Sequence, residues 1–243
     1  MREAGKRLAT VLVALRDEVK IGVTTKSLDA LAFKLIKKSG AEPAFLNYRP
    51  AGSKRAYPAT LCASVNDGVV HGLPSLYVIR DSDVIKLDLG LKYGGWYVDS
   101  AITVGVGKLD VKTQSLIKIT EEALYRAIEE ARPGNTLGDI GWAVERHVRK
   151  SGFSVVKLLT GHGIGKRLHE EPTVLNFGER GEGKKLEVGM VLAIEPMVAL
   201  GSGEIRQKED DSFVTADGLY AAHFEHTIAI TREGPRILTT LDN

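Results

Sequence analysis

A repeated segment constrains the fold of this chain more than any other feature. The stretch KIGVTTKSLDALAFKLIKKSG (residues 20–40) recurs as RPGNTLGDIGWAVERHVRKSG (residues 132–152) at a constant shift, since 132 − 20 and 152 − 40 are both 112. Each copy has a glycine in a turn, a threonine suited to cap a helix, an apolar helical stripe, basic residues in the last turn and Ser-Gly at the stop. The repeat predicts equivalent helices in two related halves.

The similarity continues into apolar segments that we predict to be strands, and it carries acidic residues with it. DVIKLDLG parallels MVLAIEPM, so that Asp88 matches Glu195, and VDSAITV parallels FEHTIAI, so that Asp99 matches Glu225. The halves therefore share a unit of two helices and two strands. We predict an α+β fold, internally duplicated with pseudo-twofold symmetry, in which the halves join their sheets, helices cover one face and the active cleft lies between the halves.

The composition limits the classes of function. Hydrophobic residues make up 43% and charged residues 26% of the chain, and no linker divides it, so we expect a single domain over residues 1–243, with halves at roughly 1–110 and 111–243. The 33 basic and 31 acidic residues are spread along the chain, which predicts no specific binding of nucleic acid and no electrostatic attraction to membranes. A single cysteine, Cys62, excludes an intrachain disulfide and fits a reducing, cytoplasmic environment.

The N-terminal stretch MREAGKRLATVLVALRDE places basic residues before an apolar run, as a signal peptide does. That run covers only residues 8–15 and leads into Arg16, Asp17 and Glu18, and its leucines recur at the helical spacing. We therefore expect an amphipathic helix that packs on the core. No stretch approaches the roughly 20 apolar residues of a membrane span.

Two of the four acids fall on neighbouring strands of a predicted hairpin. If Gly94 and Gly95 form its two-residue turn, Asp88 faces Ala101. Asp99 lies two residues from Ala101, on the same face. The Cβ atoms of the two aspartates would then be about 7 Å apart, a spacing that a metal ion can bridge.

Acids in apolar strands need positive charge nearby. One such acid alone fits a solvated residue or an ordinary salt bridge, but four at symmetry-related positions would put about four negative charges in one cleft. Burying an ionised carboxylate without partners costs several kcal/mol or more. Raised pKa values would follow unless comparable positive charge were bound, and two divalent ions would supply it.

Histidines are the next candidate ligands. His162, in TGHGIGKRLHEEP, stands between Gly161 and Gly163, whose small size lets the backbone and the imidazole approach a cleft closely. The spacing of these glycines matches neither the dinucleotide fingerprint nor the Walker pattern. His71 and His169 each sit next to turn residues, and taken alone either fits an ordinary surface histidine.

Taken in order, the motifs NDGVVHG, VIKLDLG, WYVDSA, TGHGIGKRLHEEP, MVLAIEPM and AHFEHT resemble those of the type I methionine aminopeptidases. The resemblance covers nearly the whole chain. Only 30 residues separate Glu195 from Glu225 (225 − 195 = 30), which leaves no room for the long helical insert of type II members. The resemblance implies the pita-bread fold, with a curved, largely antiparallel sheet covered by helices.

The resemblance also implies the ligands of a dinuclear metal centre. Asp88 would hold one metal, and Asp99 would bridge the two. His162 and Glu195 would hold the other metal, and Glu225 would be the second bridge. Four carboxylates and one imidazole form a mostly hard ligand set, so we expect two divalent ions per chain, with Co, Mn, Fe, Zn and Ni all open.

Two ions about 3.5 to 4 Å apart share a water, lower its pKa and polarise a carbonyl, so that a metal-bridged hydroxide would attack the peptide bond. By resemblance, Glu195 is the general base. His169 would stabilise the oxyanion, and His71 would contact the scissile amide. The implied activity removes the N-terminal methionine from nascent proteins and peptides with a small second residue.

The expected methionine pocket departs in part from the family pattern. Tyr57 and Cys62 match pocket positions, but Leu168 replaces an aromatic residue that is common just before the second motif histidine. The stretch EDDSFVTADG lacks the tryptophan that many members carry near Ser212 or Phe213. These departures concern selectivity for methionine and leave the expected metal ligands intact.

Two alternative functions are compatible with the same fold. The first is an X-Pro aminopeptidase or a prolidase-like peptidase, although those enzymes usually carry a preceding domain. The second is a non-catalytic pita-bread protein that binds a partner, although all five ligands are retained here. We expect a monomer that acts on nascent polypeptides, and contact with the ribosome is left open.

Overall fold

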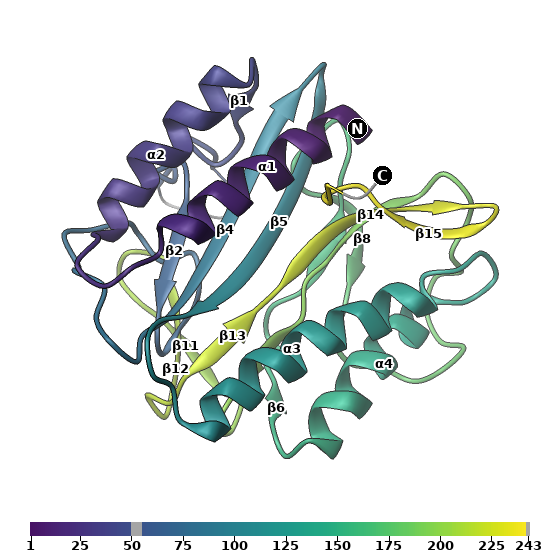
Figure 1. Ribbon diagram of the computed structural model, residues 1–243. Coiled ribbons are helices and arrows are strands. Elements are labelled where there is room, and N and C mark those ends of the chain that lie inside the picture. The colour runs from purple at the N-terminus through teal and green to yellow at the C-terminus, as the bar shows by residue number, and fades with distance from the viewer. Residues whose placement is uncertain (50–54, 242–243) are drawn as a thin grey trace.

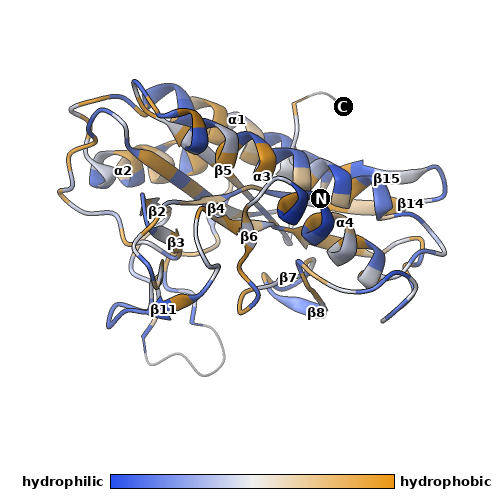
Figure 2. Ribbon diagram, turned by 90° about the horizontal axis from the view of Figure 1, so that it is seen from below, coloured by the Kyte–Doolittle hydropathy of each residue, from blue (hydrophilic) through white to orange (hydrophobic). Residues whose placement is uncertain are grey.

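The computed structural model describes residues 1–49 and 55–241, and in it a layer of helices lies on a large, curved sheet (Figure 1). Helices cover one face of that sheet, whereas short strands and loops lie on the other (Figure 2). The helices of the described residues are α1 (Arg2–Glu18), α2 (Thr25–Lys38), α3 (Val111–Glu130) and α4 (Leu137–Lys150).

The main sheet is antiparallel throughout and runs in the order β1-β4-β5-β14-β9-β7-β8, with β15 beside β14 and β2 beside β4. Its strands are β1 (Glu42–Pro43), β2 (Cys62–Val65), β4 (Val84–Tyr93), β5 (Trp96–Gly105), β7 (Gly161–Gly163), β8 (Glu170–Val174), β9 (Val191–Ile194), β14 (Glu225–Thr231) and β15 (Gly234–Ile237). Two small sheets contain β6 (Ser154–Val155), β10 (Met197–Ala199) and β13 (Ala221–His223), and β3 (Gly68–Val70), β11 (Ile205–Gln207) and β12 (Phe213–Thr215).

The two helices of the sequence repeat begin and end in the same way. Their N-caps, Thr24 and Thr136, are 112 positions apart (136 − 24 = 112). The Thr24 hydroxyl accepts a hydrogen bond from the backbone N–H of Ser27 (3.1 Å), and the Asp139 carboxylate accepts one from the backbone N–H of Thr136 (2.9 Å). A glycine with positive φ follows the C-cap serine of each helix and terminates it. The predicted helical repeat is therefore confirmed.

The sheet joins one strand pair from each half of the chain. β4 and β5 form a hairpin in the first half, β9 pairs with β14 in the second, and β5 pairs with β14 where the halves meet. Each half also buries its own apolar cluster between its helices and its strands. Fully buried examples are Leu8, Leu15, Ile36, Leu87 and Leu89 in the first half, and Leu116, Val144, Leu192 and Ile228 in the second. The duplicated α+β unit predicted from the sequence is the arrangement observed.

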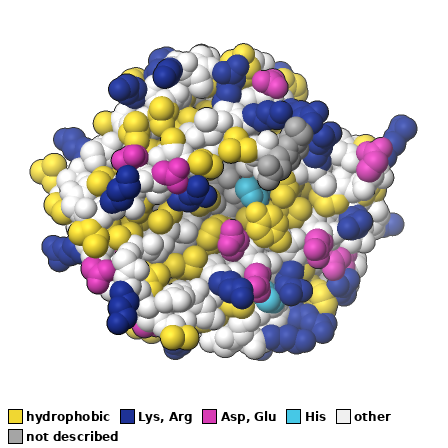
Figure 3. Space-filling model, viewed as in Figure 1, with side chains coloured by type: hydrophobic (Ala, Val, Ile, Leu, Met, Phe, Trp, Pro, Cys, Tyr) yellow, Lys and Arg dark blue, Asp and Glu magenta, His cyan; other side chains and the backbone are white. Residues whose placement is uncertain are grey.

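The N-terminal segment forms the predicted amphipathic helix. Leu8, Leu12 and Leu15 of α1 are buried against the sheet, while Asp17 and Glu18 at its end are exposed. None of the helices in residues 1–49 and 55–241 is long and apolar enough to cross a membrane. On the face covered by the helices, basic and acidic side chains are interspersed (Figure 3).

One strand is shorter than the sequence suggests. β9 ends at Ile194, so Glu195 lies just beyond the strand instead of inside it. Pro196 follows, and a proline has no N–H to donate to a ladder and restricts the residue before it. This break lets the chain leave the main sheet at Glu195 and enter β10 of the small sheet.

Candidate active site

The β4–β5 hairpin has the predicted register. Gly94 and Gly95, with φ values of 59° and 78°, form its turn. Asp88 faces Ala101, and Asp99 is therefore its diagonal neighbour on the same face of the sheet. The two carboxyl groups lie close enough to interact directly.

The second half of the chain adds its two acids to the same face. Ala101 faces Asp88 on one side and Glu225 on the other, so the three residues form one row across β4, β5 and β14. Glu195 directly follows Ile194, which pairs with His226. Glu195 thus stands beside Glu225, and the acids from the two halves meet at the junction of the halves.

His162 reaches this face because glycines surround it. A Cβ atom added at Gly161 would lie 2.3 Å from the carbonyl oxygen of Ala193, and one added at Gly163 would lie 2.2 Å from that of Glu171. Any larger residue would therefore push β7 away from its neighbours β9 and β8. The close approach that we expected from the sequence is confirmed.

The ring of His162 is oriented for ligation. Its Nδ1 lies 2.8 Å from the carbonyl oxygen of Gly163, so that Nδ1–H donates and Nε2 keeps its lone pair. Nε2 lies 3.7 Å from Oε1 of Glu195. Two groups that only accept hydrogen bonds thus face each other, which favours a cation between them.

Three side chains place their ligand atoms close enough together to bind one metal ion. One ligand atom each from Asp99, His162 and Glu225 lie within 4.8 Å of one another. Glu195 adjoins His162, and Asp88 adjoins Asp99, as described above. The structure therefore brings together all five side chains that we predicted from the sequence as candidate metal ligands.

The electrostatics of the cluster require positive charge. Burial raises the pKa of Asp88, Glu195 and Glu225 well above the ordinary range, and the neighbouring carboxylates raise it further. Burial also raises the pKa of Asp99 to about 7. Oδ1 of Asp88 and Oε1 of Glu225 are buried without a hydrogen-bond partner, and no Lys or Arg of the described chain forms an ion pair with these four acids. The unpaired hard oxygens and the free imidazole nitrogen fit divalent metal ions.

A cavity of about 650 Å³ opens onto this cluster, and every site residue predicted from the sequence lines it. His71 has a backbone φ of 58°, and its ring centroid lies 5.9 Å from that of Phe213. The ring of His169 lies 4.4 Å from that of His162. The protein packed around their rings lowers the pKa of His71 to about 4 and also lowers that of His169, so both are neutral near pH 7.

The predicted pocket residues form an apolar wall of the cavity. Tyr57 is fixed because its hydroxyl donates to the carbonyl oxygens of Leu61 and Gly72, each at 3.0 Å. Cys62 faces Asp88 across β2 and β4, and burial raises the pKa of its thiol, which stays neutral. Leu168 is buried in a cluster with Phe45 and Cys62. A leucine in place of the aromatic residue therefore still gives an apolar surface.

Three residues of the site were missed by the sequence analysis. Phe45 lines the cavity, the hydroxyl of Tyr48 lies 2.7 Å from Nδ1 of His169, and Nε2 of His223 lies 3.4 Å from Oε2 of Glu195. Tyr48 precedes its partner by 121 positions (169 − 48 = 121). The AHFEHT motif placed His223 near Glu225 in sequence, which was the one signal available for it.

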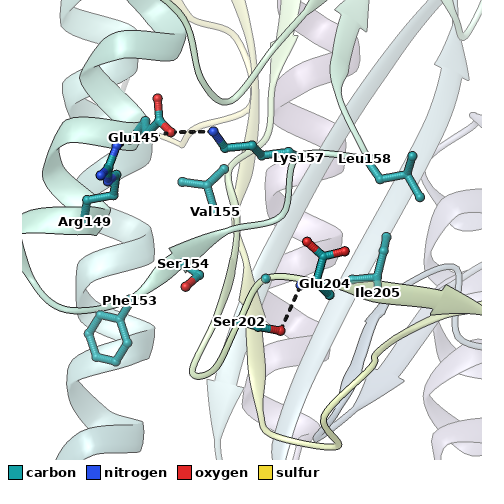
Figure 4. A pocket seen from close by; sticks show the side chains of 11 residues that line it. Glu145, Arg149, Phe153, Ser154, Val155, Lys157, Leu158, Ser202, Glu204 and Ile205 are labelled. Atoms are coloured by element: carbon teal, nitrogen blue, oxygen red, sulfur yellow. Dashed lines mark hydrogen bonds and ion pairs between the residues drawn. The ribbon is translucent and has the colours of Figure 1, made fainter.

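A second cavity, of about 760 Å³, lies between α4, β6 and the segment before β11 (Figure 4). Its wall carries an ion pair between Lys157 and Glu145 at 2.7 Å. None of the predicted site residues lines it, and Leu158 alone among the described lining residues belongs to both cavities. The candidate metal ligands and catalytic residues therefore line the first cavity and not the second.

Known proteins resemble this chain both in sequence and in fold. The sequence model of metallopeptidase family M24 matches residues 1–232. The methionine aminopeptidase of Aquifex aeolicus is 48% identical over 246 residues, covering 99% of this chain and 95% of the relative. The crystal structure of methionine aminopeptidase from Thermotoga maritima has a TM-score of 0.94 at 41% identity, covering 99% of this chain and 95% of that chain.

Prolidases share the fold at a greater distance. The prolidase of Pyrococcus horikoshii has a TM-score of 0.78 at 25% identity, and the match covers 100% of this chain but 61% of that chain. The pita-bread architecture predicted from the sequence is therefore confirmed.

Proposed function

The chain belongs to metallopeptidase family M24, and we propose that it is a methionine aminopeptidase, which hydrolyses the peptide bond after the N-terminal methionine of peptides and nascent proteins. One observation carries this proposal. Five ligand-type side chains, four of them acidic, converge at a single cavity whose wall also carries two neutral histidines. A free α-amino group, which is positively charged, suits such an acidic cleft, and this explains exopeptidase action.

We propose two divalent metal ions per chain. Asp88 and Asp99 of the first half and His162, Glu195 and Glu225 of the second half would hold them. Support comes from the pseudo-twofold sheet, which supplies one pair of acids from each half. When bound, such ions lower the pKa of a water molecule and polarise the scissile carbonyl, and Co, Mn, Fe, Zn and Ni all suit this ligand set.

Glu195 acts as the general base in this proposal. Its Oε1 is directed at the ligand cluster, 3.7 Å from His162, where it can take a proton from the attacking water. The amide of Asn176 donates to the backbone carbonyl of Glu195 at 3.0 Å and fixes the main chain there. Glu195 then passes the proton to the leaving amine.

The two cavity histidines have separate roles. The hydroxyl of Tyr48 lies 2.7 Å from Nδ1 of His169, and in this proposal His169 takes the tautomer in which the hydroxyl donates to Nδ1. Nε2 of His169 must then carry a hydrogen, which can stabilise the oxyanion of the tetrahedral intermediate. His71, whose ring packs beside Phe213, contacts the scissile amide in this proposal.

The methionine side chain occupies the apolar wall formed by Phe45, Tyr57, Cys62 and Leu168. We propose nascent polypeptides with a small second residue as substrates, met in the cytoplasm by a monomeric enzyme. Contact with the ribosome stays an open prediction. Relative cleavage of Met-Ala and Ala-Pro peptides separates this activity from that of a prolidase-like enzyme, and failure to bind metal would indicate a non-catalytic relative.

The direct test is release of methionine from Met-Ala-Ser before and after removal of metal. A chelator should abolish the activity, and added Mn(II), Fe(II) or Co(II) should restore it, because the buried carboxylates cannot activate water alone. Circular dichroism of the chelated protein serves as the control for folding. Full activity in excess chelator would refute the proposal.

A further inference from the structure

His223 is a buried histidine whose ring has no hydrogen-bond partner among the residues that the structure describes. It ends β13, two residues before Glu225, and is only 1% exposed. Neither Nδ1 nor Nε2 forms a hydrogen bond with any residue of 1–49 or 55–241. Unpaired buried polar groups are rare because their desolvation is not compensated. An apolar residue at this position would therefore give a more stable folded state. The buried imidazole therefore needs a functional explanation.

The position of His223 is fixed by its backbone. The hydroxyl of Thr103 donates to the carbonyl oxygen of His223 at 2.6 Å and accepts from its N–H at 2.9 Å. β13 also pairs with β10, where His223 faces Met197, two residues after Glu195. These contacts hold the ring beside the Glu195 side chain.

The carboxylate of Glu195 lies between two histidines. Its Oε1 is 3.7 Å from Nε2 of His162, whereas its Oε2 is 3.4 Å from Nε2 of His223. One oxygen thus faces His162 of the ligand cluster, and the other faces His223. The distance of 3.4 Å is longer than a typical hydrogen bond, and such contacts in catalytic sites often tighten only when the reacting groups are bound.

We propose that His223 is a positioning residue for Glu195. Its Nε2–H donates to Oε2 and keeps Oε1 directed at the metal ligands, which fixes the orientation in which Glu195 both binds metal and accepts a proton. Such outer partners of a ligating carboxylate set its geometry without touching the substrate. The inference rests on the role proposed above for Glu195.

The test compares three variants with the wild-type protein. His223→Leu removes the donor and fills similar space, while His223→Gln keeps a donor in the same direction. His226→Leu is the matched control, since His226 is a half-buried histidine directly after Glu225 whose Nδ1 lies 2.9 Å from the hydroxyl of Thr239 and whose ring lies near Tyr125 of α3. Each variant is assayed for its Mn(II) dissociation constants by calorimetry, for kcat and KM on Met-Ala-Ser, and for Tm.

We expect His223→Leu to weaken Mn(II) binding and to lower kcat by about 10- to 100-fold each, with KM changed much less. His223→Gln and His226→Leu should stay near the wild-type values in both measurements. If His223→Leu does not fold, His223→Met takes its place. Unchanged Mn(II) affinity in the leucine variant, or equal damage in the glutamine variant, would overturn the inference. A wild-type protein that binds no Mn(II) would instead contradict the proposed function.

Discussion

His71 shows how the site is built at the scale of single residues. Its φ of 58° lies in the left-handed region, which a non-glycine residue enters at a cost of about 1 to 3 kcal/mol. The neighbouring strand β3 pairs with β12, whose Phe213 packs on the His71 ring, and these contacts hold the strained residue in place. Strain of this kind is found where a side chain must point into a site.

Replacing His71 by alanine tests its proposed role. Within the described part of the chain, the group of close ligand atoms consists of Asp99, His162 and Glu225 and does not include His71, so the variant should keep its metal content. Turnover of Met-Ala-Ser should fall by about 10²-fold, as is typical when one positioned hydrogen-bonding group is removed. Steady-state kinetics and metal analysis by plasma mass spectrometry check this. Loss of bound metal in His71→Ala would reassign the residue as a ligand.

The residues of the site differ in how far the sequence could predict them. Asp88 and Asp99 could be paired because a two-glycine turn fixes the register of a hairpin. The contacts of Tyr48 with His169 and of His223 with Glu195 could not be predicted, since they join side chains whose neighbours depend on how the sheets pack. Local patterns carry no information about such contacts.

At the scale of elements, β7 illustrates why small residues surround a ligand. β7 pairs with both β8 and β9, so that the strand is enclosed on its two edges. Gly161 and Gly163 leave room for neighbouring carbonyl oxygens at distances that no Cβ could tolerate. The element presents His162 to the site only because its flanking positions have no side chains.

Replacing a glycine of β7 should therefore weaken metal binding, although the glycine itself is not a ligand. In Gly161→Ala the new Cβ would lie 2.3 Å from the carbonyl oxygen of Ala193, so the strand must shift and carry His162 with it. We expect a lower Tm and Mn(II) binding weakened by at least about 10-fold. Gly165→Ala is the control, because its Cβ would meet only the flexible carboxylate of Glu170, at 3.1 Å. Equal Mn(II) affinity in both variants, measured by calorimetry, would show that β7 does not position the ligand.

The long elements were predictable and the short ones were not. α2 and α4 have threonine caps, apolar stripes and Ser-Gly stops, which together define both ends of a helix. The sequence predicts a longer strand than β9 because apolar residues stand on both sides of Glu195 and Pro196, and the effect of a proline depends on which edge of the strand is paired. Strands of three residues, such as β3 and β12, give too little pattern to identify.

The whole molecule is organised around its pseudo-twofold symmetry. β5 and β14 are equivalent strands of the two halves, and they pair with each other at the centre of the sheet. The acids of both halves consequently meet there, where their mutual repulsion would oppose folding unless cations were bound. The sequence repeat could predict this meeting because it fixed which positions are equivalent. The shape of the cavity could not be predicted, since it depends on loops outside the repeat.

The most direct test of this account is anomalous diffraction from crystals of the protein grown with Mn(II). We predict two anomalous peaks per chain, about 3.5 to 4 Å apart, lying among Asp88, Asp99, His162, Glu195 and Glu225. Bound Mn(II) should be absent from the same position after Glu225→Ala has removed one shared ligand, or be reduced there to a single weak peak. Carboxylates that gather without any peak between them in the wild-type protein, or peaks at some other place, would contradict the account.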